Sequence, residues 1–258
     1  MTDNISAADD SAATLENPTT RRGAHRSEKR GGWIFVRDIL VIFVVALLVS
    51  FLIKTFLVRS FYIPSGSMKD TLQIDDRILV NELVPNVINL ERGDVVVFRD
   101  PGGWLPPAAP KPDPGPLAAS AEWVFSLVGL ASPDSDDHLI KRVIGLPGDR
   151  VECCNALGQM TVNGVPLNEP YVLMPPGKDS VSEIKFSVTV PKDSLWVMGD
   201  NRYDSADSRY NQDDPGKGFV HIDDVVGRAF VITWPFDRFG WLGNYPETFQ
   251  GVPESPSK

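Results

Sequence analysis

A continuous apolar run near the N-terminus places the strongest constraint on this chain. The run covers residues 39–58, 20 positions whose only polar members are Ser50, Lys54 and Thr55. As an α-helix it would be about 30 Å long, which matches the hydrocarbon thickness of a bilayer. A buried core helix and the core of a cleavable signal peptide are the alternatives. Since the run is long for a signal core and no small-x-small cleavage site follows it, we predict an uncleaved transmembrane helix at residues 38–58.

The residues before this run indicate the orientation of the helix. Residues 1–37 are rich in Ser, Thr, Ala, Asp and Arg, without an apolar period, which is typical of a disordered tail. Basic residues gather in the second half of this tail: Arg21, Arg22, Arg26, Lys29, Arg30 and Arg37. The positive-inside rule then places the N-terminus in the cytoplasm and everything after the helix outside the cytoplasmic membrane.

The rest of the chain has the pattern of short strands. Its 258 residues include 21 Gly and 22 Pro, which suits many strands and turns. β-prone runs occupy residues 77–84, 93–99, 138–149, 159–165, 185–190 and 225–234. We predict a mostly β domain at residues 59–240, with a Pro-rich insertion at 100–137 and a loose C-terminal tail at 241–258. The formal net charge of −9 argues against a nucleic-acid partner.

Two adjacent cysteines, Cys153 and Cys154, are the only ones in the chain. They cannot build a zinc site or a disulfide framework. A bond between neighbours closes a small strained ring, so two unpaired thiols are favoured over a vicinal disulfide formed in an oxidising compartment. We expect no metal and no cofactor, because the acidic stretch 200–204 lacks the glycine and the distal glutamate of a calcium loop.

Two serines flank a glycine just after the apolar run, at Ser65 and Ser67. A serine hydroxyl becomes a nucleophile only when a nearby base takes its proton. Three histidines are candidates for that base. His25 lies in the tail across the predicted membrane, which leaves His138 and His221. A lone histidine of this kind is more often a packed or surface residue than a base.

Lys141 is the other candidate base. It lies in a β-prone apolar run, where an alternating strand places it on the face of Leu139 and Val143. On such a face the ammonium loses hydration and its pKa falls, so that the neutral amine can accept a serine proton. From the residue pattern alone, a lysine that reaches solvent or pairs with an acid is favoured.

Four segments in order resemble the boxes of bacterial type I signal peptidase, also called leader peptidase. They are Pro-Ser-Gly-Ser-Met at 64–68, Arg-Gly-Asp-Val-Val-Val-Phe at 92–98, the run 141–149 that begins with Lys-Arg and ends with Gly-Asp, and the run 198–209 that begins with Met-Gly-Asp-Asn. The similarity covers about residues 61–234. It implies an antiparallel β-sheet catalytic domain of two lobes behind one transmembrane helix. It also implies a serine endopeptidase that removes N-terminal signal peptides from exported preproteins through an acyl-enzyme.

The resemblance assigns roles residue by residue. It implies that Ser67 is the nucleophile and Lys141 the general base, that Ser65 donates to the oxyanion together with the backbone N–H of Ser67, and that Ser205 orients the lysine. Ion pairs and hydrogen bonds that brace the site are implied for Asp200, Arg142, Asp207 and Arg209. Pockets for small side chains at the −1 and −3 positions of the substrate are implied for Phe61, Ile63, Pro64, Met68, Leu72, Leu139 and Ile140.

The implied partners are signal-peptide-bearing preproteins, membrane lipid and the protein-export machinery. Two other functions fit parts of the pattern. A self-cleaving Ser-Lys repressor would share the catalytic fold, but it would carry a DNA-binding helical domain where this chain has its apolar run. An anchored, non-enzymatic β domain acting as an adhesion or assembly module is the second alternative, with the serines as ordinary turn residues.

Overall fold

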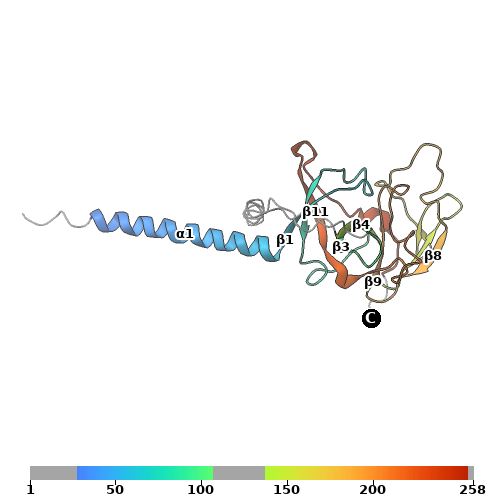
Figure 1. Cartoon of the computed structure of the whole chain (residues 1–258), viewed down its shortest axis with the longest axis horizontal. Coiled ribbons are helices and arrows are strands. Elements are labelled where there is room, and N and C mark those ends of the chain that lie inside the picture. The colour runs from blue at the N-terminus through green and yellow to red at the C-terminus, as the bar shows by residue number, and fades with distance from the viewer. Residues whose placement is uncertain (1–27, 107–136, 255–258) are drawn as a thin grey trace, which may run out of the picture. The chain divides into compact units, whose positions relative to one another are not determined.

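The computed structural model describes residues 28–106 and 137–254. The chain divides into two units, Met1–Val49 and Ser50–Lys258. Helix α1 (Glu28–Phe56) contains the apolar run up to Phe56, and its window Trp33–Phe51 is long and apolar enough to cross a membrane (Figure 1). None of that window is buried, which argues against a core helix. The predicted tail at residues 1–27 lies outside the described residues.

The predicted end of the helix at residue 58 was wrong. Val58 is the first residue of strand β1 (Val58–Tyr62), which pairs antiparallel with β2 (Arg77–Asn81). In β1 the buried Phe61 lies between residues that are more exposed. This alternation is that of a half-buried strand. Pairing with β2 gives the backbone N–H and C=O groups of β1 the hydrogen bonds that a longer helix would otherwise have supplied.

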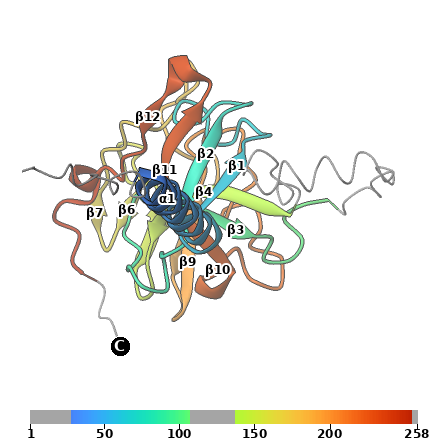
Figure 2. The same ribbon diagram turned by 90° about the vertical axis from the view of Figure 1, so that its left-hand side faces the viewer.

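A larger sheet of eight strands forms the centre of the second unit, and each of its pairings is antiparallel. Its order is β1, β2, β11 (Val225–Trp234), β3 (Val95–Arg99), β4 (His138–Gly145), β9 (Ser194–Met198) and β10 (Val220–His221), with β12 (Gly240–Trp241) paired to β11 (Figure 2). The prediction of a mostly antiparallel β domain is confirmed.

A smaller sheet has the order β7 (Val165–Pro166), β6 (Thr161–Val162), β5 (Arg150–Cys153) and β8 (Phe186–Thr189). Asn163 and Gly164 connect β6 and β7 with φ angles of 52° and 82°. Positive φ at both central residues is what a two-residue type I′ hairpin requires. In Figure 1, β8 lies on the opposite side of the domain from β1. The described residues also form three short 3-10 helices: η1 (Ile222–Asp224), η2 (Phe236–Arg238) and η3 (Pro246–Phe249).

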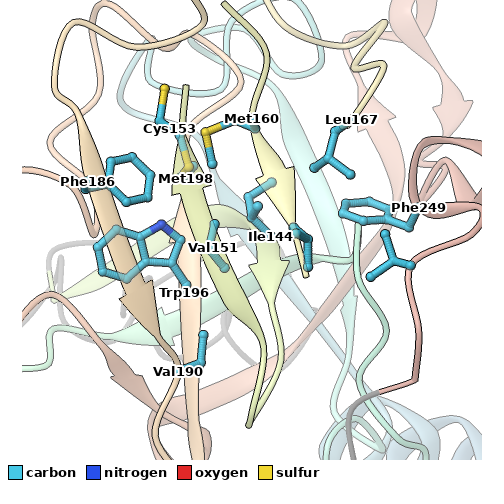
Figure 3. Packing of buried hydrophobic residues seen from close by; sticks show 12 residues of the cluster. Ile144, Val151, Cys153, Met160, Leu167, Phe186, Val190, Trp196, Met198 and Phe249 are labelled. Atoms are coloured by element: carbon cyan, nitrogen blue, oxygen red, sulfur yellow. The ribbon is translucent and has the colours of Figure 1, made fainter. Parts of the chain in front are cut away.

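Three apolar clusters form the core. The first lies at the smaller sheet, where the rings of Phe186 and Trp196 are 5.1 Å apart (Figure 3). The other two are built by the larger sheet; one contains Phe61 and Ile140, and the other contains Phe98 and Val143. Trp104 packs edge-on against Phe98 at the start of the predicted insertion. Residues 107–136 of that insertion lie outside the described residues.

The favoured prediction of two unpaired thiols was wrong. The structure joins Cys153 and Cys154 in a disulfide, with the two Cα atoms 3.0 Å apart. Cys153 is buried in the core at the end of β5, and Cys154 packs against the same cluster. Both sulfur atoms are therefore held next to one another, which the sequence spacing alone could not indicate.

The predicted loose tail at residues 241–258 was also wrong over its described part. Thr248 and Phe249 in η3, and Val252 after it, are buried. Phe249 and Val252 belong to the core cluster of the smaller sheet, and Figure 3 shows Phe249 beside Leu167. A few apolar residues in a polar, Pro- and Gly-containing segment are enough to fix it, because each finds a partner in the core.

Candidate active site

Ser67 and Lys141 meet although 74 residues separate them. Ser67 lies in the loop that follows β1, and Lys141 lies on β4. The Nζ atom of Lys141 is 2.8 Å from the Oγ atom of Ser67 and donates a second hydrogen bond to the carbonyl of Ile140 at 3.0 Å. Only 7% of Ser67 and 3% of Lys141 are exposed. The contact is within hydrogen-bond reach, which is the first requirement for a nucleophile and its base.

Burial changes the protonation of Lys141. Desolvation lowers the pKa of Lys141 from 10.5 to about 8, and the negative charges of Asp207 and Asp200 oppose this shift only in part. The sequence pattern alone favoured a lysine that reaches solvent, and the burial of Lys141 contradicts that expectation. A neutral amine beside a serine hydroxyl can accept its proton near neutral pH.

The loop after β9 holds the serine in place. The backbone N–H of Asn201 donates to the carbonyl of Ser67 at 3.1 Å, and the Asn201 side-chain amide donates to the carbonyl of Gly66 at 3.1 Å. Gly199 allows the two loops to approach this closely. A Cβ atom at Gly199 would lie 2.4 Å from the Ser67 carbonyl oxygen and 2.3 Å from the Ser205 hydroxyl.

Ser65 lies beside the predicted nucleophile. Its Oγ atom is 3.4 Å from the Oγ atom of Ser67. Two hydroxyls this close can address one substrate carbonyl, with Ser67 attacking the carbon and Ser65 donating to the oxygen. The role of Ser65 as an oxyanion donor stays a prediction.

A buried ion pair connects the strand of Lys141 to the serine loop. Arg142 donates to both carboxylate oxygens of Asp200, from Nε at 2.8 Å and from Nη2 at 2.6 Å. Both side chains are fully buried. Thr71 donates to the same carboxylate at 2.5 Å, so Asp200 ties β4 to the loop that carries Ser67.

A second buried pair lies on the other side of the loop. Arg209 donates to both carboxylate oxygens of Asp207 at 2.8 Å, and Asp207 also accepts from the backbone N–H of Gly199 at 3.0 Å. The Ser205 hydroxyl is buried and has no hydrogen-bond partner among the described residues. The Ser205 hydroxyl therefore makes no hydrogen bond to Lys141 here, and its orienting role stays a prediction.

The structure brings most of the predicted pocket residues into one apolar cluster. Phe61, Ile63, Met68, Leu72 and Ile140 all belong to it. Pro64 is exposed beside the cluster. Leu139 does not belong to it, because consecutive side chains of a strand point to opposite faces. Leu139 packs instead with the cluster of Val143 and Phe98.

The two remaining histidine candidates have other partners. The Nδ1 atom of His138 is 2.7 Å from the carboxylate of Asp137, and its ring lies 5.4 Å from that of Phe61. His221 is half exposed and accepts a hydrogen bond from the N–H of Asp223. In residues 28–106 and 137–254, no group of three or more His, Cys, Asp or Glu side chains is arranged to hold a metal ion.

Four residues of the site were missed by sequence reasoning. Asn201 lies in the segment 198–209 of the resemblance, and Thr71 lies three residues after the segment 64–68. Their closeness in sequence to Asp200 and Ser67 could have marked them as candidate site residues. Tyr171 and Tyr245 contact Arg142 with their rings from outside those segments. Nothing local marks either tyrosine, because the contact depends on the folded chain.

Comparison with known proteins identifies the family of the chain. The family model of signal peptidase, peptidase S26, matches residues 36–234. A probable signal peptidase I of Mycobacterium leprae is 35% identical, over 86% of this chain and 83% of its own length. Signal peptidase I of Mycobacterium tuberculosis is 36% identical, over 91% of this chain and 81% of its own length. A probable signal peptidase I-2 of Synechocystis is 36% identical, over 77% of this chain and 73% of its own length. The chain therefore belongs to the signal peptidase family of serine peptidases, peptidase S26.

Proposed function

We propose that this protein is a membrane-anchored serine endopeptidase that removes signal peptides from exported preproteins, with Ser67 as nucleophile and Lys141 as general base. The observation that carries the assignment of the two residues is the 2.8 Å contact between Lys141 Nζ and Ser67 Oγ in a buried setting. Family membership supports the reaction. Neither the repressor nor the adhesion module receives support from the comparisons.

The geometry supports a two-step reaction. The neutral amine of Lys141 takes the proton of Ser67 while Oγ attacks the scissile carbonyl. The Ser65 hydroxyl and the Ser67 backbone N–H donate to the oxyanion that forms. The Lys141 ammonium then gives its proton to the leaving amine, which departs as the new N-terminus of the mature protein. Water hydrolyses the acyl-enzyme, again with Lys141 as base, and Ser67 is regenerated.

The substrate can bind as an added strand. β4 pairs with β9 only from Arg142 onward, so its first residues have no β9 partner on that side. β1 is the first strand of the sheet order, and the ring contact of Phe61 with His138 brings it near the same part of β4. An extended peptide can hydrogen-bond to such strand edges. Its small −1 and −3 side chains would then enter the apolar cluster of Phe61 and Ile140.

The anchor and the surface of the domain support a membrane location. We infer that α1 crosses the cytoplasmic membrane with residues 1–37 inside and residues 59–258 outside, as the basic residues before the apolar run predict. Four exposed aromatic residues between the end of β11 and β12 suit the headgroup region of a bilayer: Trp234, Phe236, Phe239 and Trp241. We call these four the aromatic patch and assign lipid as their partner. The shared substrate makes the export machinery a further proposed partner.

Processing of a preprotein with an Ala-x-Ala site by the full chain in detergent tests this function. The wild type should release the mature protein, and Ser67→Ala and Lys141→Ala should each abolish release. His221→Ala is the matched control and should retain activity, because His221 is exposed and bonded to Asp223. Near-normal turnover by Lys141→Ala would show that Lys141 is not the general base. A wild type without activity would contradict the proposed function itself.

A further inference from the structure

The C-terminal segment, which we define as residues 243–252, packs against the buried support of the site. Its Asn244 carbonyl lies so close to Gly93 that a Cβ atom at Gly93 would be 1.8 Å from it. Thr248 donates to the carbonyl of Asn168 at 2.9 Å, and Phe249 and Val252 are core residues (Figure 3). The segment follows the last residue of the family match, position 234. It is thus a fixed part of the domain outside the matched region.

Arg142 lies against two neighbouring aromatic rings, one of them from the C-terminal segment. Its Cζ atom lies 4.0 Å from the ring centre of Tyr171 and 5.2 Å from that of Tyr245. The two rings are 5.0 Å apart and tilted. The Nη1 atom also donates to the carbonyls of Gly93 at 2.7 Å and Gly243 at 3.2 Å. Aromatic faces and carbonyl oxygens both favour a cation, so these contacts hold the guanidinium where it lies.

The position of Arg142 bears on Lys141 through Asp200. Asp200 and Asp207 are the carboxylates whose charges act on Lys141. Each is paired with a buried arginine, Asp200 with Arg142 and Asp207 with Arg209. A cation held against Asp200 offsets its negative charge. If that cation moves away, more of the charge acts on Lys141 and favours the ammonium over the neutral amine.

We propose that Tyr245 is a positioning residue of the Ser67–Lys141 site and acts by holding Arg142 on Asp200. This inference rests on the proposed function, in which neutral Lys141 is the base. Tyr245 does not touch the reacting atoms. Its ring lies next to that of Tyr171, and the two rings together cover one part of the guanidinium. Removal of the ring admits water to Arg142, which weakens its hold on Asp200 and also lessens the desolvation of the site. Both changes favour the charged form of Lys141.

The test compares pH profiles of the full chain in detergent. Tyr245→Leu should move the acid limb of kcat/KM to higher pH by about half a unit, which is about a threefold loss of rate below the limb. Tyr245→Phe keeps the ring and should restore the wild-type limb. Thr248→Val is the matched control, because it breaks a hydrogen bond of the same segment without touching Arg142. It should lower Tm while leaving the limb in place.

A wild-type acid limb in Tyr245→Leu, in an enzyme whose Ser67→Ala variant is inactive, would overturn the positioning role while leaving the proposed function standing. An equal shift of the acid limb in Thr248→Val would also overturn the positioning role, since the shift would then follow the lower stability of the domain and not the contact with Arg142. A second measurement does not depend on turnover. The 13Cε shift of Lys141 in lysine-labelled protein, assigned by its loss in Lys141→Ala, should titrate at higher pH in Tyr245→Leu. An unchanged titration would reject the inference even if the wild type cleaved no preprotein.

Discussion

Arg142 donates hydrogen bonds to both carboxylate oxygens of Asp200, at 2.8 and 2.6 Å. Arg142 directly follows Lys141 in β4. Two cations on adjacent residues of one buried strand would repel each other in a medium of low dielectric. The Asp200 carboxylate offsets the charge of Arg142. Burial lowers the pKa of Lys141, so Lys141 is the group of the two that loses its proton. Burial opposes the charge of Arg142 as well, but the hydrogen bond and charge of Asp200 raise its pKa, so it stays a cation.

The first prediction concerns pH. Burial lowers the pKa of Lys141 to about 8, and the proposed base is its neutral amine, so kcat/KM should fall about tenfold for each pH unit below that value. Below the folded pKa the ammonium predominates, so activity is lost as pH falls and is recovered as pH rises through the pKa. Initial rates on a preprotein from about pH 6 to pH 9 give the profile. A constant rate down to the lower limit would show that Lys141 is not the base.

A second prediction concerns the oxyanion. Ser65→Ala should lower kcat about a hundredfold, the scale for losing one oxyanion donor, with little change in KM. The residual activity reflects the backbone N–H of Ser67 and the intact base. Ser187→Ala is a fair control, since this exposed hydroxyl in the smaller sheet bonds to Glu152. A Ser65→Ala variant with wild-type kcat would remove Ser65 from the oxyanion site.

A third prediction uses the close approach at Gly199. Gly199→Ala places a Cβ atom 2.4 Å from the Ser67 carbonyl oxygen and must push the two loops apart. We expect a loss of at least about a hundredfold in kcat, as is typical when reacting groups are displaced by about 1 Å. At Gly240 the nearest atom to an added Cβ is 3.8 Å away. Gly240→Ala should keep its activity, and equal losses in the two variants would argue against the displacement.

A fourth prediction addresses the aromatic patch. In lipid nanodiscs, quenchers carried in the headgroup region should reach Trp241, which is 76% exposed, but not Trp196, which is fully buried. Trp241→Phe should therefore reduce the quenchable fraction of the fluorescence, and Trp196→Phe should raise it. Equal quenching of wild type and Trp241→Phe would show that this part of the patch does not meet lipid.

Local patterns predicted much of the fold. The Asn163–Gly164 turn follows from its dipeptide, and most strands follow from β-prone runs bounded by Gly and Pro. The boundary between α1 and β1 could not be read in this way, because the apolar run continues through Leu57 to Val58, the first residue of β1. Pairing of Phe61 with Ile78 decides it. Tertiary pairing therefore ends the helix where local propensity does not.

The site was predicted mainly by resemblance. Residue physics alone favoured a solvated Lys141, since the depth of burial depends on chain segments that lie far away in sequence. The same limit explains Leu139, which the resemblance placed in the pocket with Ile140 although the strand turns the two residues to opposite faces. Tyr245 shows the limit most clearly. Its partner Arg142 lies about a hundred residues earlier, and no local pattern around either residue predicts their contact.

The packing of the C-terminal segment has a consequence for the timing of maturation. Gly243 and Tyr245, which contact Arg142, lie about a hundred residues after Lys141 in the chain. During synthesis, which begins at the N-terminus, the segments that carry Ser67 and Lys141 are made before the residues that complete the surroundings of Arg142. A newly made domain would therefore reach the final surroundings of Lys141 only after residues 243–245 have been made and packed.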